Sequence, residues 1–118
     1  MRRVWCWRCK MEVPMLDEEE FERVAGHFRE GKSELIQAEP ADGPAWQHPI
    51  MTTATKRLLD EYNRITGFGE TNPNAVWHHR LSLYGPPCHA CGKLLRSPTA
   101  RFCAACGATR EEPVGPAA

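Results

Sequence analysis

The spacing of apolar residues predicts two amphipathic helices. After Asp17, apolar residues recur at i, i+3, i+4 and i+7 from Phe21 to Phe28, and charged residues fill the positions between them. Asp17 is a suitable N-cap, and Glu20 lies three residues later, as in a capping box. The first helix is therefore expected to end near Gly31, with its charged face exposed to solvent.

A second helix is expected in the middle of the chain. Its apolar stripe runs from Leu58 to Ile65, and Gly67 suits the left-handed position that often ends a helix. Three threonines are candidate caps for its first turn: Thr52, Thr53 and Thr55. Because two such helices cannot enclose a core alone, a third packing surface is expected.

The composition of the remaining chain indicates loops and one undecided segment. Residues 31–49 are rich in proline and glycine and predict a long linker, whereas residues 75–84 fit either a strand or a short helix. The expected organisation has four parts: an N-terminal Cys-x-x-Cys knuckle at 1–16, a helical core at 17–84, a zinc ribbon at 85–110 and a disordered tail at 111–118. The fold class expected from these parts is small α+β.

Charge is balanced overall but unevenly distributed. The 118 residues contain 15 Lys and Arg and 15 Asp and Glu. Residues 1–16 and 71–118 each sum to +3, whereas residues 17–30 sum to −4. No apolar run is long enough to span a membrane, and the first residues lack the apolar segment of a signal peptide. A cytoplasmic protein without a membrane partner is therefore expected.

The six cysteines form three Cys-x-x-Cys pairs, which in a reducing compartment favour metal binding over disulfides. The strongest signal is a pair of knuckles with four candidate zinc ligands: Cys88, Cys91, Cys103 and Cys106. Each knuckle is followed by a glycine, Gly92 or Gly107, which permits the positive φ of a tight turn. This spacing predicts a zinc ribbon with short strands at 93–96 and 100–102. Four thiolates close the coordination shell of zinc, so the ion is expected to be structural.

The first pair, Cys6 and Cys9, is followed by Lys10 instead of glycine. A second zinc ion held by this pair would need further ligands, and His78 and His79 are the candidates. Packed thiols and a redox-active dithiol are the alternatives, although a redox turn of the thioredoxin type would open directly into a helix.

No catalytic triad, phosphate loop or dinucleotide fingerprint is present, and this favours a non-enzymatic protein. Nucleic-acid binding is one hypothesis, because the C-terminal segment has basic residues and aromatic residues suited to stacking. The basic residues are Arg80, Lys93, Arg96, Arg101 and Arg110, and the aromatic ones are Trp77, Tyr84 and Phe102. An excess of only three charges predicts weak binding, so a protein-binding module, rich in tryptophan, is the leading hypothesis.

Several segments together resemble a group of small uncharacterised bacterial zinc-ribbon proteins. These segments are 6–9, 13–16, 65–68, 70–72 and 78–88, followed by the ribbon. Small proteins of this kind are similar in style to immunity proteins, which bind and neutralise a cognate toxin. The uneven charge distribution then suggests a mechanism, in which the acidic residues that begin the first helix, or a groove beside them, would occlude a basic active-site cleft of the toxin. These residues are Asp17, Glu18, Glu19 and Glu22.

Overall fold

The computed structural model describes residues 2–111, which form two compact units. We call residues 2–18 and 78–111 the cysteine unit, because they contain all six cysteines, and residues 19–77 the helical unit. The described residues include a two-stranded antiparallel sheet and three α-helices, and this confirms the small α+β class. The division joins the two ends of the described chain in one unit, a grouping that chain order does not indicate.

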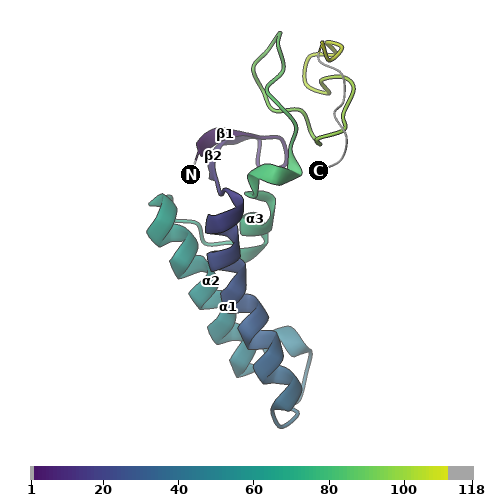
Figure 1. The fold of residues 1–118 in the computed structure, drawn as a ribbon. Coiled ribbons are helices and arrows are strands. Elements are labelled where there is room, and N and C mark those ends of the chain that lie inside the picture. Colours follow the sequence, from purple (N-terminus) through teal and green to yellow (C-terminus); the bar gives the residue numbers. More distant parts are fainter. Residues whose placement is uncertain (1, 112–118) are drawn as a thin grey trace. The chain divides into compact units, whose positions relative to one another are not determined.

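Helices α1 (Glu18–Gln37) and α2 (Pro49–Thr66) run side by side (Figure 1). The prediction that the first helix ends near Gly31 is wrong. Gly31 is buried within α1, and a side chain at this position would collide with the Cβ of Ala54 in α2. Glycine here permits close helix packing instead of ending the helix. Residues 38–48 alone connect the two helices, with a short 3₁₀ turn at Ala45–Gln47.

The ends of α2 show one wrong prediction and one confirmed prediction. The helix begins at Pro49, and Nδ1 of His48 accepts a hydrogen bond from the backbone N–H of Ile50 at 3.1 Å. A histidine is therefore the cap, and the three threonines lie inside the helix. At the other end, Gly67 adopts a φ of 67° and its N–H donates to the carbonyl oxygen of Asn63, as predicted.

A short helix, α3 (Pro73–His78), supplies the third packing surface. The indole of Trp77 meets the rings of Phe21 and Phe28 edge to face, with centroids 5.7 and 5.4 Å apart. The buried side chains of this core are Phe21, Val24, Ala25, Met51, Ala54, Leu58, Tyr62, Ala75 and Val76. The undecided segment 75–84 is thus helical as far as His78, and its next part forms a 3₁₀ turn at Leu81–Leu83.

The cysteine unit begins with a hairpin of β1 (Arg2–Cys6) and β2 (Met11–Met15). Cys6 pairs with Met11 at its closed end, so Cys6 and Cys9 flank the turn. Directly after the hairpin, Leu16 forms a parallel bridge with Arg80. This bridge joins the hairpin to a segment more than sixty residues later in the chain.

The C-terminal part of the cysteine unit has little regular structure (Figure 1). The strands predicted at 93–96 and 100–102 are wrong: only isolated antiparallel bridges occur, between Pro87 and Leu94 and between Phe102 and Thr109. Each bridge joins the residues on either side of one knuckle. The two predicted strands do not pair with each other. A small core consists of Cys88, Leu95 and Cys103, with Ala100 and Ala108 packed against it. The predicted tail lies outside the described residues from position 112 onward.

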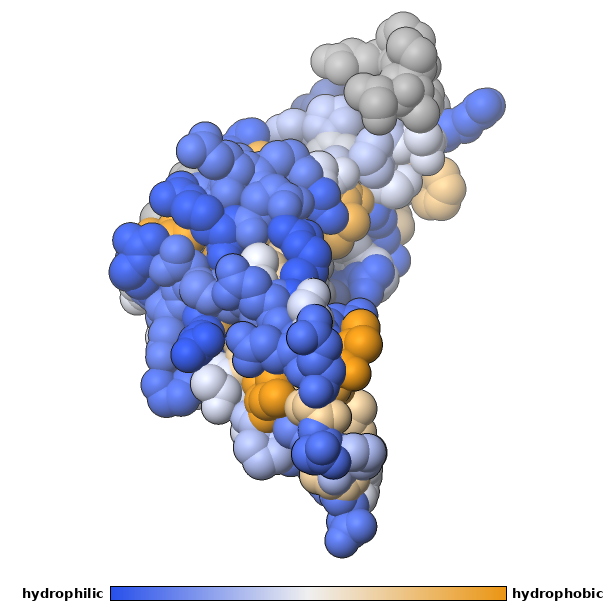
Figure 2. Space-filling view, turned by 60° about the horizontal axis from the view of Figure 1, so that its bottom comes forward, coloured by the Kyte–Doolittle hydropathy of each residue, from blue (hydrophilic) through white to orange (hydrophobic). Residues whose placement is uncertain are grey.

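In Figure 2 most of the visible surface is hydrophilic, and hydrophobic residues reach it in a few groups. Ile36 and Trp46 are among the most exposed large hydrophobic residues, with 85% and 70% of their surface accessible. No helix among residues 2–111 has the length and apolar character needed to cross a bilayer. The cytoplasmic location stays a prediction.

Candidate metal centres

The thiols of the last two cysteine pairs converge. The Sγ atoms of Cys88 and Cys106 are 3.6 Å apart, as are those of Cys91 and Cys103, and all four atoms lie within 4.8 Å of one another. A tetrahedral zinc ion with Zn–S bonds of about 2.3 Å requires sulfur atoms about 3.8 Å apart. A disulfide would bring them to about 2.05 Å. The four thiols could therefore hold a metal ion, and the donor set matches that of zinc.

Both knuckles have the backbone conformation predicted for them. Gly92 and Gly107 have φ angles of 79° and 84°. The N–H of Gly92 donates to the carbonyl oxygen of Cys88 at 2.9 Å, and that of Gly107 to Cys103 at 2.7 Å. The positive φ closes each turn, and this brings two thiols three positions apart to one point.

The knuckle backbone also promotes ionisation of a thiol. The N–H groups of Cys91 and Ala90 lower the pKa of the Cys88 thiol to about 6, and the Ala90 nitrogen lies 3.4 Å from its sulfur. A thiolate is the form that binds zinc, so the lowered pKa of Cys88 favours metal binding. A four-thiolate shell is closed and leaves no position for an activated water.

A second group of ligand atoms consists of Cys6, Cys9 and His79, whose sulfur and ring nitrogen atoms lie within 4.8 Å of one another. Nε2 of His79 is 3.4 Å from Sγ of Cys9, and His79 is fully buried. His78 is not part of this group; its carbonyl oxygen accepts a hydrogen bond from the hydroxyl of Tyr84. Of the two histidines considered from the sequence, the geometry selects His79.

The knuckle of Cys6 has the same form as the other two. Lys10 has a φ of 57°, and its N–H donates to the carbonyl oxygen of Cys6 at 2.8 Å. The lysine thus occupies the left-handed position that glycine occupies after Cys91 and Cys106. The absence of glycine after Cys9 therefore does not prevent a knuckle of this form. The Cys-x-x-Cys spacing itself was the better signal.

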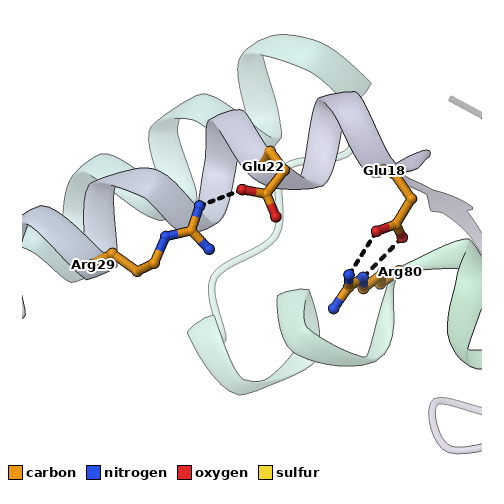
Figure 3. Close-up of polar contacts among 4 residues, drawn as sticks. All are labelled: Glu18, Glu22, Arg29 and Arg80. Atoms are coloured by element: carbon orange, nitrogen blue, oxygen red, sulfur yellow. Dashed lines mark hydrogen bonds and ion pairs between the residues drawn. The ribbon is translucent and has the colours of Figure 1, made fainter.

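Backbone pairing places His79 beside the hairpin. The carbonyl oxygen of His79 accepts a hydrogen bond from the N–H of Leu16 at 2.7 Å, and the N–H of Leu81 donates to the carbonyl oxygen of Leu16 at 2.9 Å. Arg80, between these two contacts, donates two hydrogen bonds to Glu18 at 2.9 and 2.6 Å (Figure 3). His79 and the two residues that follow it are therefore all anchored by hydrogen bonds.

Hydrogen bonds from Arg80 and Ser82 lower the pKa of Glu18 to about 2. Glu22, one turn further along α1, forms an ion pair with Arg29 (Figure 3). Two of the four acidic residues considered for a protein partner, Glu18 and Glu22, are therefore engaged with arginines of the same chain.

Cations lie over the two tryptophans of the hairpin. The Lys93 ammonium is 4.1 Å from the ring centroid of Trp5. The guanidinium carbons of Arg96 and Arg8 are 4.5 and 4.8 Å from that of Trp7. Each of these three contacts is a cation–π interaction. The contacts of Lys93 and Arg96 join the hairpin to the segment between the last two knuckles.

The aromatic residues considered from the sequence for stacking are mostly engaged elsewhere. Trp77 packs in the helical core and Tyr84 is buried, so only Phe102, with 60% of its surface accessible, is well exposed. Trp5 and Trp7, which carry the cation–π contacts, were not among the residues considered for stacking. Their signal in the sequence was their position on either side of Cys6.

Charge separates between the two units. The cysteine unit has nine Lys and Arg against four Asp and Glu, whereas the helical unit has six against ten. A divalent ion on four thiolates subtracts two charges, so the metal-loaded cysteine unit still has an excess of about three positive charges. The basic excess is thus concentrated in about half of the described residues.

Comparison with known proteins finds relatives among enzymes. Two proteins from two strains of Bacillus cereus, each named "Uncharacterized RNA methyltransferase", are 28% and 27% identical to this chain over 85 residues. The match covers 72% of this chain and 18% of each relative, so the chain spans less than a fifth of their length. No protein-family model matches, and no solved structure matches. The prediction of a non-enzymatic protein is contradicted, because these relatives are named as enzymes.

Proposed function

We propose that this chain is a metal-stabilised RNA-binding module that acts in RNA methylation. The proposal rests on one observation, the cation–π surface formed by Trp5, Trp7, Arg8, Lys93 and Arg96. The names of the two relatives supply the direction, because a protein that methylates RNA must also bind it. The proposal concerns the binding of RNA by this chain as one part of RNA methylation.

The cation–π surface has the chemistry that single-stranded RNA requires. A guanidinium that lies over an indole keeps its N–H donors directed outward in the plane of the group, where phosphate oxygens can accept them. Indoles and guanidinium planes also stack on unpaired bases, and one such contact contributes about 1–3 kcal/mol. Arg8 and Arg96 are exposed, and no carboxylate pairs with either of them within residues 2–111.

The metal centre has a structural role in this proposal. Lys93 follows the Cys88/Cys91 knuckle directly, and Arg96 lies three residues later. Without an ion, four thiols and a small core of three buried residues would have to hold this segment against the hairpin. A zinc ion on the four thiolates fixes the segment and with it the two cations.

The proposal is tested by titrating a labelled single-stranded RNA with the zinc-loaded chain and following fluorescence anisotropy. Replacing Lys93 and Arg96 together by glutamine should weaken binding by about tenfold at low salt and reduce the slope of log K against log salt by about 0.7 per lost phosphate contact. The matched control replaces Lys56 and Arg57 of α2 by glutamine, which removes the same charge from the helical unit. Equal losses for both variants, or no RNA binding, would contradict the proposal.

A substitution of an aromatic residue separates stacking from charge. Trp7→Leu leaves every cation in place, so it should weaken RNA binding while the salt slope stays near that of the wild type. In cells that lack the chain, we expect a methylated nucleoside to be depleted from total RNA, measured by mass spectrometry of digested RNA. Restoration by the wild type but not by the Lys93/Arg96 double variant would link binding to methylation.

The hypothesis of a toxin-neutralising immunity protein stays a prediction. It depended on an acidic surface on the first helix, and Glu18 and Glu22 of that surface are already paired with arginines. Co-expression with a cognate toxin and measurement of growth rescue remains its test.

A further inference from the structure

We propose that Cys6, Cys9 and His79 bind a second zinc ion, with an exchangeable solvent molecule as the fourth ligand. This site is separate from the four-cysteine centre and goes beyond RNA binding. Its donor set of two thiolates and one imidazole is one that zinc accepts. On binding, the two thiols release their protons, and His79 binds through Nε2 as a neutral imidazole.

The distances fit a zinc ion. With Zn–S bonds of about 2.3 Å and Zn–N bonds of about 2.0–2.1 Å, a tetrahedral site requires a sulfur-to-nitrogen distance of about 3.6 Å. The distance from Sγ of Cys9 to Nε2 of His79 is 3.4 Å, and Sγ of Cys6 lies within 4.8 Å of both. No large movement of the chain is needed for all three atoms to reach one ion.

The backbone of the first knuckle is an independent argument. In this knuckle and in that of Cys88, a backbone N–H contacts the sulfur of the first cysteine: Cys9 N, three positions on, lies 3.4 Å from Sγ of Cys6, and Ala90 N, two positions on, lies 3.4 Å from Sγ of Cys88. Lys10 keeps a left-handed conformation that costs a non-glycine residue about 1 kcal/mol or more. Gly92 and Gly107 have the same left-handed conformation at the same position after the second cysteine, so the first turn shares the backbone form of the other two knuckles.

The burial of His79 is a third argument. A histidine with no accessible surface would lose the hydration of its ring, and this is costly unless both ring nitrogens find partners. The hydrogen bond from the N–H of Leu16 to the carbonyl oxygen of His79 holds the backbone of this residue beside the hairpin. A bound ion would contact both Nε2 of His79 and the thiols, and so join the hairpin to the segment that contains Arg80.

The fourth position is assigned to solvent for two reasons. Among residues 2–111, no further Cys, His, Asp or Glu places a ligand atom within 4.8 Å of all three atoms, and Cys9 is partly exposed. The hydroxyl of Tyr84 lies 3.7 Å from Sγ of Cys6, but it donates its proton to the carbonyl oxygen of His78 at 2.5 Å. Zinc sites with three protein ligands usually keep water at the fourth position.

The number of ions is measured by native mass spectrometry of the full chain, purified under reducing conditions with zinc present. We expect two zinc ions in the wild type and one in Cys9→Ser. His79→Cys should retain two, because a third thiolate replaces the imidazole. His78→Ala, which changes the adjacent residue of the same type, should also retain two. A single ion in the wild type, or two in Cys9→Ser, would overturn the second site.

The solvent position has its own test, made with cobalt in place of zinc and without RNA, so that its result does not depend on RNA binding. Imidazole or azide added to the cobalt protein should shift the d–d absorption bands of the wild type, and this shift should be absent in Cys9→Ser, where only the closed site remains. Tyr84→Phe should keep two ions and the same shift. No shift in the wild type, or loss of an ion in Tyr84→Phe, would overturn solvent as the fourth ligand.

Discussion

The two units of this protein are stabilised by different kinds of interaction. The helical unit has a conventional core, in which three helices bury aliphatic and aromatic side chains against one another. The C-terminal part of the cysteine unit has isolated bridges in place of strands, and two of the three residues in its small core are cysteines. Small domains with little apolar core commonly obtain their stability from metal or disulfides. The comparison indicates that the C-terminal part of the cysteine unit depends on its cysteines for stability, whereas the helical unit depends on apolar packing.

Removal of metal should have the largest effect, and we expect it to unfold part of one unit only. A chelator should unfold the C-terminal part of the cysteine unit, because structural zinc contributes on the order of 10 kcal/mol to small metal domains. The helical unit should stay folded. Hydrogen exchange followed by mass spectrometry should show lost protection in residues 85–110 and retained protection in residues 49–66. Equal loss in both segments would mean that the units depend on one metal-stabilised core.

The converse experiment removes apolar packing from the helical unit. Leu58 is almost fully buried in α2, so Leu58→Ala should lower the free energy of unfolding of this unit by about 2–5 kcal/mol, measured by chemical denaturation. The zinc content should be unchanged. Thr53→Ala, at an exposed position of the same helix, is the matched control and should have little effect. Loss of zinc in Leu58→Ala would contradict the separation of the two units.

A smaller effect is expected at the left-handed lysine of the first knuckle. Lys10→Gly should be more stable than Lys10→Ala by about 1 kcal/mol, because both variants remove the charge but only glycine adopts a positive φ without strain. Denaturation of the zinc-loaded protein measures the difference. In the knuckle of Cys88 and Cys91, Gly92→Ala should lower the free energy of unfolding by a similar amount, because alanine is strained at this positive φ. Equal stability of the two Lys10 variants would show that φ is not under strain there.

The smallest effect concerns the ion pair beside His79. Hydrogen bonds from Arg80 and Ser82 depress the pKa of Glu18 from its usual 4.5 to about 2. A depressed carboxyl pKa contributes stability that is present above about pH 4.5 and is lost as the pH falls towards 2. An NMR titration should therefore give a low pKa for Glu18 in the wild type and an ordinary one in Arg80→Gln. Ser82→Ala should raise it less. An ordinary pKa in the wild type would contradict the pairing.

Local patterns predicted the parts of the fold that local physics controls. Periodic apolar residues predicted both long helices. Gly67 predicted the end of the second, because a helix end depends on the conformation of one residue. The predictions failed where a distant segment intervened. Gly31 continues a helix because Ala54 lies against it, and the predicted ribbon strands do not form because each knuckle closes on its own flanking residues.

The candidate sites show the same division. The spacing of Cys88, Cys91, Cys103 and Cys106 was enough to bring four thiols together, because each pair lies on a tight turn of known form. The sequence could not show which of His78 and His79 reaches the thiols. Adjacent side chains point to different sides of the backbone, and only the folded structure shows which side faces Cys6 and Cys9. The cation–π surface was also beyond it, because Trp7 and Arg96 meet only after the chain has folded.

The sequence by itself determined the class of fold, the presence of the two long helices, the three cysteine knuckles and the uneven distribution of charge. The charge distribution is read directly from the residues, and the other features depend on interactions between residues close together in the chain. The tertiary structure alone decided that the two ends of the described chain form one unit, that His79 joins Cys6 and Cys9, and that Lys93 and Arg96 lie over tryptophans of the hairpin. These features join residues about 70–90 positions apart, and their closeness depends on the packing of the whole unit, which no local pattern records.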